Sequence, residues 1–172
     1  VLALVAADLL QVPPAVVGAL AWVVAASHAV RLYLWQPWRT FGTPIVWVLH
    51  VAYGWVVVYL LLRGLSAFGF VGELLAVHAL TVGAIGGMTI GMMTRTARGH
   101  TGRALVADRF EVACYVLDVL AATLRVFGGM LLPDAYGATV VASGICWSAA
   151  FALYAVRYWP VLSRPRLDGK PG

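Results

Sequence analysis

Side chains able to bind a metal fall within long apolar stretches of this sequence. His28, His50 and His78 each lie inside such a stretch. Imidazole is a ligand for haem iron and for copper. Ionisable groups inside apolar spans are costly, and they usually have a function. The alternative is that each histidine only hydrogen-bonds to a neighbouring helix, as polar groups in membrane bundles do.

Four metal-capable residues would share one depth if these stretches are membrane-spanning helices. At a rise of about 1.5 Å per residue, His28, His50, Met88 and Cys114 each lie about 9 to 10 Å from the same side. His78 lies near the opposite face. Two histidines on neighbouring helices at equal depth could ligate one haem or help to hold a copper ion. Met88 could add a thioether, although methionine more often fills apolar space.

Three charged residues occur at seven-residue steps in one apolar stretch: Glu111, Asp118 and Arg125. On a helix they share one stripe, which must face the interior of a bundle. The stripe could form a proton path, supply an arginine to a haem propionate, or make structural ion pairs. Asp118 and Arg125 would be about 10 Å apart along the axis, so we expect each to pair with another helix.

The segment 95–103 is short, basic and rich in hydroxyl groups and glycine, and it includes His100 and Arg103. Arginine and backbone N–H donors in such a segment could clamp an anion, for example a haem propionate. The segment could equally serve only as a positively charged anchor at the membrane surface. Spacing alone does not separate these two interpretations.

Glycines before this segment recur at four-residue spacing, at Gly83, Gly87 and Gly91. One face of the predicted helix is therefore nearly bare. This pattern is typical of close contact between membrane helices. It could also make room for a flat porphyrin, but packing is the interpretation that we favour.

The composition of the whole chain defines the elements that carry these residues. Hydrophobic residues make up 62% of the 172 residues and charged residues 11%, against roughly 45–50% and 25% in soluble domains. The chain is therefore expected to be an integral membrane protein whose partner is the lipid bilayer. Its net charge of +5 indicates loop charge and does not suggest nucleic acid. Motifs for nucleotide binding, zinc binding or a soluble nucleophile do not occur, so the sequence does not decide whether the protein is an enzyme.

Five apolar segments of about 19–25 residues have the length needed to cross a hydrocarbon core of roughly 30 Å. A shorter run, 1–10, looks like the end of a further span. The sequence therefore predicts an all-α fold, a polytopic transmembrane helix bundle with five full spans plus the tail of a preceding one. Residues 1–172 should form a single transmembrane domain with a cytoplasmic tail at 161–172. The five spans are expected at 14–34, 44–62, 73–94, 108–132 and 135–159.

Basic residues are distributed unequally between the two sides that these spans define. Ten lie in or beside the loops on one side and the C-terminal tail, whereas Arg63 alone lies on the other side. Because positive loops stay in the cytoplasm, the C-terminus is predicted to be cytoplasmic. Aromatic residues near the predicted inner ends resemble an interfacial belt: Trp35, Trp38, Tyr154, Tyr158 and Trp159.

Two sequence signatures resemble a known family. The first comprises WQPWR at 35–39 and WVLHVAY at 47–53, and the second reads HALTVGAIGGMT at 78–89, MMTR at 92–95 and GHTGR at 99–103. Together they resemble the NnrS family of bacterial membrane proteins, over roughly two thirds of the chain. The second signature is too specific to arise by chance.

The resemblance implies a multi-pass protein of the bacterial inner membrane that contains haem and copper. It also implies a role in nitric oxide metabolism or nitrosative-stress protection, with this chain as the C-terminal half of a longer protein. We expect His28, His50 and His78 as metal ligands, and four further residues near the cofactors: Met88, His100, Arg103 and Arg125. A membrane transporter for a metal ion or small anion is the alternative, because buried acids, an arginine and histidines fit that class too.

Overall fold

The computed structural model describes residues 2–167 and 169, and within them all regular structure is helical, with no strand. Six helical segments follow one another. The first three are α1 (Leu2–Leu9), α2 (Pro14–Leu34) and α3 (Pro44–Ala67), with the short 3-10 helix η1 (Pro37–Thr40) between the last two. The fourth joins α4 (Glu73–His78), the π-helical η2 (Ala79–Gly86) and α5 (Gly87–His100). The fifth joins α6 (Arg109–Thr123), the π-helical η3 (Leu124–Gly128) and α7 (Gly129–Leu131), and α8 (Tyr136–Leu162) follows the 3-10 turn η4 (Pro133–Ala135).

Four of these segments are long and apolar enough to cross a membrane: Pro14–Leu34, Pro44–Ala67, Glu73–His100 and Pro133–Leu162. The chain is thus a multi-pass membrane protein, as expected. The segment 109–131 matches the remaining predicted span in position but is not among the four. It carries Arg109, Glu111, Asp118 and Arg125, which set it apart from the other helices.

The third predicted span ends later than hydropathy indicated. Helix α5 continues to His100, whereas the apolar pattern ends near 94. Arg98 and His100 therefore lie on a helix, and only 101–108 form the loop. Gly102 ends this helical segment with a φ of +70°, a left-handed conformation that glycine adopts without strain.

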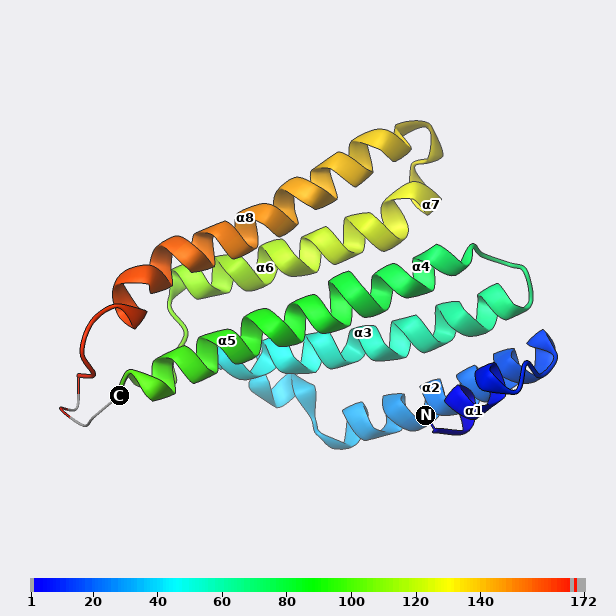
Figure 1. Ribbon diagram of the computed structural model, residues 1–172, viewed down its shortest axis with the longest axis horizontal. Helices are drawn as coiled ribbons and strands as arrows, with labels where there is room; N and C mark the ends of the chain where they lie inside the picture. The colour runs from blue at the N-terminus through cyan, green and yellow to red at the C-terminus, as the bar shows by residue number, and fades with distance from the viewer. Residues whose placement is uncertain (1, 168, 170–172) are drawn as a thin grey trace.

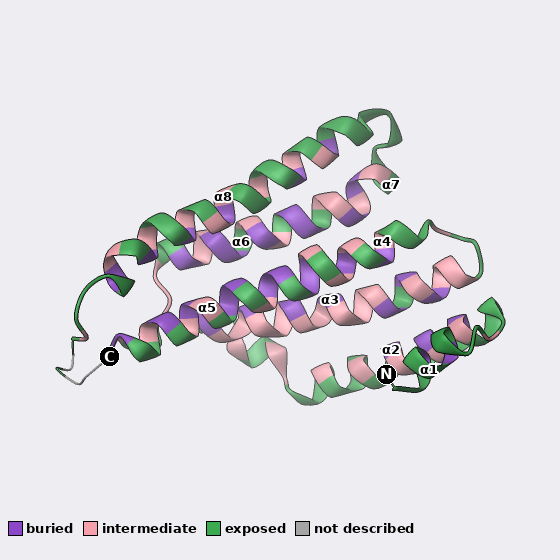
Figure 2. Ribbon diagram, viewed as in Figure 1, coloured by how far each residue is buried: buried purple, intermediate pink, exposed green. Residues whose placement is uncertain are grey.

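Helix α3 and the continuous α4–η2–α5 segment form the middle layer of the bundle (Figure 1). α2 packs on α3 at one edge, with α1 beside it, and α6 and α8 pair at the other edge. Burial follows this order, since buried residues are frequent in α5 and α6, α3 is largely intermediate, and α2 and α8 have many exposed residues (Figure 2). The helices at the rim expose most of their apolar surface.

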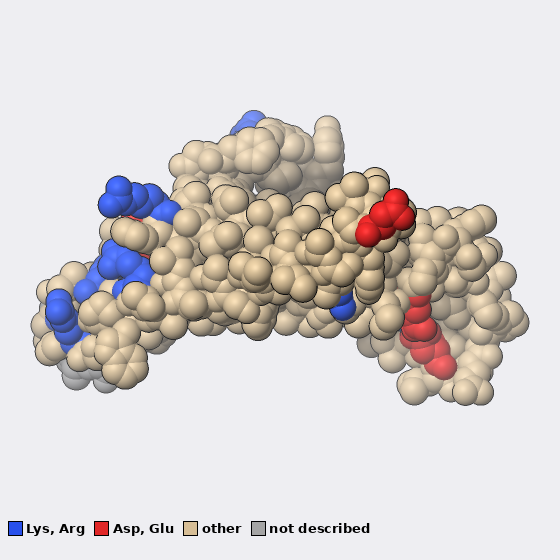
Figure 3. Space-filling model, turned by 90° about the horizontal axis from the view of Figure 1, so that it is seen from above, with Lys and Arg blue, Asp and Glu red and all other residues tan. Residues whose placement is uncertain are grey.

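Arginine side chains gather at the end of the bundle where the C-terminus lies, and acidic residues are visible at the opposite end (Figure 3). Lys170, which the charge pattern assigned to the same side, lies outside the described residues. The basic end contains η1, the loop 101–108 and the end of α8 (Figure 1). The loops that the charge pattern assigned to one side do lie at one end of the molecule. Which membrane side they face remains a prediction.

Candidate functional site

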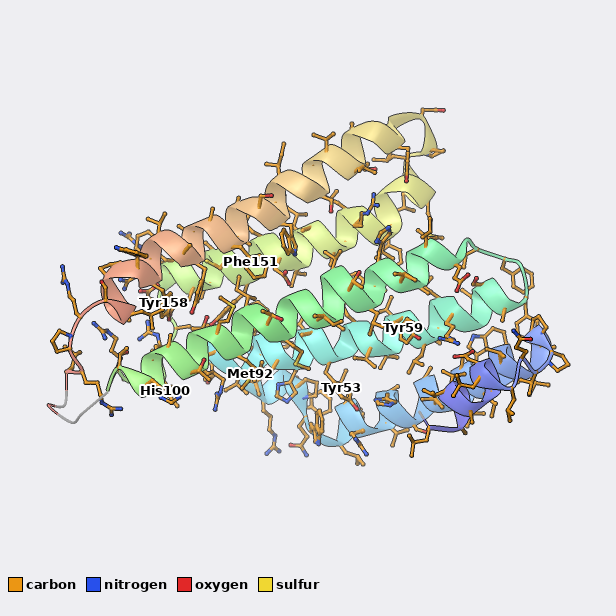
Figure 4. The ribbon with its side chains drawn as sticks, in the orientation of Figure 1. Tyr53, Tyr59, Met92, His100, Phe151 and Tyr158 are labelled. Atoms are coloured by element: carbon orange, nitrogen blue, oxygen red, sulfur yellow. The ribbon has the colours of Figure 1, made fainter. Side chains whose placement is uncertain are left out.

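His28 and His50 meet a shared group of aromatic rings between α2 and α3, which we call the α2–α3 aromatic cluster: His28, Trp35, His50 and Tyr53. The rings of His28 and Tyr53 lie 5.5 Å apart between centroids, and Trp35 lies 4.8 Å from Tyr53. The His50 ring stands edge-on to Trp35 at 6.1 Å. Tyr53 lies between the two helices (Figure 4). The structure therefore brings these two predicted ligands to one interface, separated by aromatic rings.

One ring nitrogen of each histidine in this cluster already has a partner. His28 Nδ1 lies 2.6 Å from the Tyr53 hydroxyl, and His50 Nδ1 lies 3.1 Å from the carbonyl oxygen of Val46, one turn earlier. Since a carbonyl can only accept, His50 Nδ1 carries the proton and Nε2 keeps its lone pair. Metal-binding histidines are held in this way, with the second nitrogen hydrogen-bonded to fix the ring. Both histidines are half-buried.

His78 lies at the other end of the bundle from this cluster. It lines a cavity of about 220 Å³ together with Arg125, Gly129 and Tyr136. His78 and Arg125, which belong to different helical segments, therefore meet at this end of the bundle. An imidazole and a guanidinium in one cavity can hold an anionic group, and neither has a carboxylate among the lining residues.

The glycine face of η2 and α5 packs directly on α3. A Cβ at Gly83 would collide with the Trp55 ring, and one at Gly87 would come within 2.9 Å of the Ala52 Cβ. Gly91 lies in the same way against Leu49 and Val48. The packing interpretation is therefore confirmed, and the Trp55 indole occupies the space that a porphyrin would need there.

Glu111 anchors a polar network at the basic end of the bundle. Arg98 donates two hydrogen bonds to its carboxylate, of 2.7 and 2.8 Å, and the Tyr158 hydroxyl donates another. The backbone N–H of Asp108 donates a fourth, of 2.6 Å, to complete a capping box at the start of α6. Tyr158 lies where α8 meets α6 (Figure 4), and one turn earlier the Tyr154 hydroxyl donates to the Met93 carbonyl of α5. The network thus joins three helices through one buried carboxylate.

Asp108 extends this network into the loop. Its carboxylate accepts a 2.7 Å hydrogen bond from Arg157 and bonds from the backbone N–H groups of Phe110 and Glu111. Burial opposes its ionisation, but these hydrogen bonds outweigh burial and hold the pKa of Asp108 below its usual value. Arg103 lines a neighbouring cavity of about 170 Å³, where its Nη1 is buried and has no hydrogen-bond partner among the described residues.

The remaining candidate residues do not gather at either histidine site. Met88 is half-buried on α5, while Met92 and His100 are exposed further along the same helix (Figure 4). Cys114 is buried in a different cluster, beside Val48 and Ile90. Equal depth along the helices therefore did not bring these residues to one centre. Within residues 2–167 and 169, no three His, Cys, Asp or Glu side chains are grouped as a ready metal site.

Sequence patterns did not predict the roles of four aromatic residues. Tyr53 and Trp35 support the two histidines, although both lie inside the first sequence signature. Tyr154 and Tyr158, which we assigned to an interfacial belt, are instead buried at 7% and 2% exposure. Asp118 was expected to pair with another helix, but its Oδ1 has no hydrogen-bond partner within residues 2–167 and 169. A one-dimensional pattern gives the depth of a residue but not the direction in which its side chain points.

Comparison with known proteins identifies one family. The model of the family described as NnrS protein matches residues 1–166, which extends the resemblance through the last long helix. No curated protein and no solved structure matches the chain.

Proposed function

The chain belongs to the NnrS family, and on that premise we propose that it is a haem- and copper-binding membrane protein. Its role would lie in nitric oxide metabolism or in protection against nitrosative stress. The observation that carries this proposal is the α2–α3 aromatic cluster. Two histidines there each use one nitrogen for a hydrogen bond within the protein, and this is how axial and copper ligands are oriented.

The donor set fits haem more directly than a copper site built from this chain alone. A haem needs only one or two protein ligands, and His28 and His50 can supply them through Nε2. A bound haem iron would supply a site for nitric oxide. His78 is the third candidate ligand, and Arg125 in its cavity suits a propionate. Arg103, whose buried Nη1 has no hydrogen-bond partner in the part of the chain that the structure describes, is a second candidate for an anionic group.

We also propose that 109–131 spans the membrane and that the basic end of the bundle faces the cytoplasm. All three parts of this segment, α6, η3 and α7, contact α8. Its buried acids, Glu111 and Asp118, face other helices instead of lipid. The arginines at the basic end support the orientation, because cytoplasmic loops retain positive charge. Reaction with an impermeant thiol reagent at a cysteine placed in 101–108, on intact cells and on inverted vesicles, tests the orientation.

The cofactor proposal is tested by the visible spectrum and the copper content of the intact protein purified in detergent. Replacement of His28 or His50 by alanine should abolish or strongly reduce the haem spectrum, and His78→Ala tests the third ligand. Ser27→Ala is the matched control, since Ser27 is exposed beside His28 and bonds only its own helix at Val23. The control should keep the full spectrum.

Tyr53→Phe tests whether His28 binds the cofactor as a ligand that the Tyr53 hydroxyl orients. It removes only the hydroxyl that meets His28 Nδ1 and keeps the aromatic ring. Loss of such a supporting hydrogen bond weakens cofactor affinity by about 10- to 100-fold. A folded protein without haem or copper would contradict the proposal and favour transport of a metal ion or small anion.

A further inference from the structure

Asp118 is a buried carboxyl group without a counter-charge. Its side chain is 1% exposed, and Oδ1 has no hydrogen-bond partner among the described residues. The carboxyl lies against two consecutive glycines of the neighbouring segment. A Cβ at Gly86 would come within 2.9 Å of Oδ1, and one at Gly87 within 3.3 Å of Oδ2. The two glycines therefore leave the space that this carboxyl occupies.

Glu111 on the same helix shows what an ionised carboxylate requires in this bundle. It has Arg98 as a bidentate partner and two further donors. Asp118 has no such cation. An unpaired carboxylate in a water-free interior is so unfavourable that the group binds a proton or another cation, which neutralises it. We propose that Asp118 is a proton-binding site in the middle of the bundle, which exchanges its proton through an adjoining cavity.

That cavity lies between η2, η3 and α8 and has a volume of about 270 Å³. Trp147 lines the cavity and lies near the carboxyl, because a Cβ added at Gly86 would be 3.6 Å from Trp147 Nε1 and 2.9 Å from Asp118 Oδ1. Ser143, Ser148 and Arg125 give the wall polar groups, which a water-filled proton route requires. The proton that leaves Asp118 would pass to water in this cavity, with no bond to carbon and no electron transferred.

None of the described groups next to Asp118 on the neighbouring helices carries a positive charge, so a proton is the species that neutralises its carboxylate. The α5 side contributes glycine backbone, α3 contributes Ala52 next to Gly87, and α8 contributes the neutral Trp147. On its own helix, Cys114 and Tyr115 lie one turn earlier, and Arg125 lies two turns later in the cavity wall. Glu111 lies two turns earlier on the same stripe, where Arg98 already balances its charge. The positive charge of Arg125 would disfavour binding of a second cation there. It would also stabilise the ionised carboxylate that remains after the proton is released. The π-helical η2 and η3 flank the site, and π segments often mark functional positions.

Infrared spectroscopy of the intact protein in detergent tests the proposal without a cofactor. A protonated carboxyl has a carbonyl stretch that is separate from the bands of ionised carboxylates, and exchange with deuterium shifts it. We expect this band in the wild-type protein and its loss in Asp118→Asn. Asp134→Asn is the control, because Asp134 is exposed near η4 and should leave the band intact. Asp118→Asn copies the shape of the neutral acid, so its thermal midpoint should stay close to that of the wild type.

Each other outcome overturns part or all of the proposal. Absence of the band in the wild type, or a band that survives in Asp118→Asn, removes the proton site. A band that does not shift after prolonged exposure to D₂O leaves a sealed acid and removes the exchange. A thermal midpoint that rises with NaCl but not with choline chloride, only when Asp118 is present, identifies a sodium site instead. If Asp118→Asn does not fold, Gly86→Ala, which presses on Oδ1, should shift the band, and an unchanged band contradicts the assignment.

Discussion

Replacement of Glu111 by alanine should destabilise the protein far more than replacement of an exposed acid. Glu111 is 2% exposed and accepts four hydrogen bonds, and the Arg98 side chain paired with it is 13% exposed. Removal of one partner from a buried ion pair leaves the other charge uncompensated and lowers the free energy of unfolding by about 3–5 kcal/mol. The remaining partners of Arg98 are weak, since Asp108 lies 3.7 Å away and Ala104 offers one carbonyl.

The Asp8–Arg63 pair supplies an internal comparison. Its side chains are 40% and 27% exposed, so solvent screens the interaction. Asp8→Asn should therefore lower the free energy of unfolding by about 0–1 kcal/mol. Both variants can be measured by reversible unfolding in mixed micelles with increasing dodecyl sulfate, followed by far-ultraviolet circular dichroism.

A double variant shows whether the loss comes from the stranded charge. Arg98→Met combined with Glu111→Leu removes both charges and keeps apolar volume, so it should be less destabilising than Glu111→Ala alone. A Glu111→Ala loss below about 1 kcal/mol, the range of an exposed pair, would refute the reasoning. Equal additive losses from Arg98 and Glu111 would refute it as well, because paired residues must show coupling.

Further predictions concern helix packing and pH. Gly83→Ala should lower the free energy of unfolding by about 1–3 kcal/mol, because its Cβ collides with the Trp55 ring. Gly144→Ala, where α8 leaves open space, should raise it by about 0.5–1 kcal/mol. Because the pKa of Asp108 is lower in the folded than in the unfolded protein, its ion pair with Arg157 stabilises above the unfolded value and is lost as pH falls. The difference in unfolding midpoint between wild type and Asp108→Asn should therefore be present at pH 7 and shrink as the pH falls below about 4; a constant difference would contradict this assignment.

The membrane spans could be predicted because the bilayer imposes their length and composition. The starts at Pro14 and Pro44 agree with the structure, since proline suits the first turn of a helix. The end of α5 could not be read from hydropathy. Residues 95–100 are polar, yet arginine and alanine favour helix, and the helix continues past the apolar pattern.

The candidate site was predictable in its residues more than in its contacts. Depth along a helix brought His28 and His50 to the same α2–α3 interface, where the rings of Tyr53 and Trp35 lie between them. It did not indicate that Cys114 faces a different cluster, because that depends on the rotation of each helix about its axis. The π-helical segments also could not be foreseen, since their composition is that of ordinary apolar helix.

The π-helical η2 sets the rotational phase between the two halves of one long helix. Each residue of an α-helix turns the chain by about 100°. Shortening Ala79–Gly86 by one residue would therefore rotate α5 against α4 by a comparable angle. The Gly87 and Gly91 face would then turn away from α3 whenever His78 kept its place in the Arg125 cavity. The two α-helical halves are therefore rotated relative to each other about a common axis. This rotation lets one continuous segment direct its histidine toward one neighbour and its glycine face toward another.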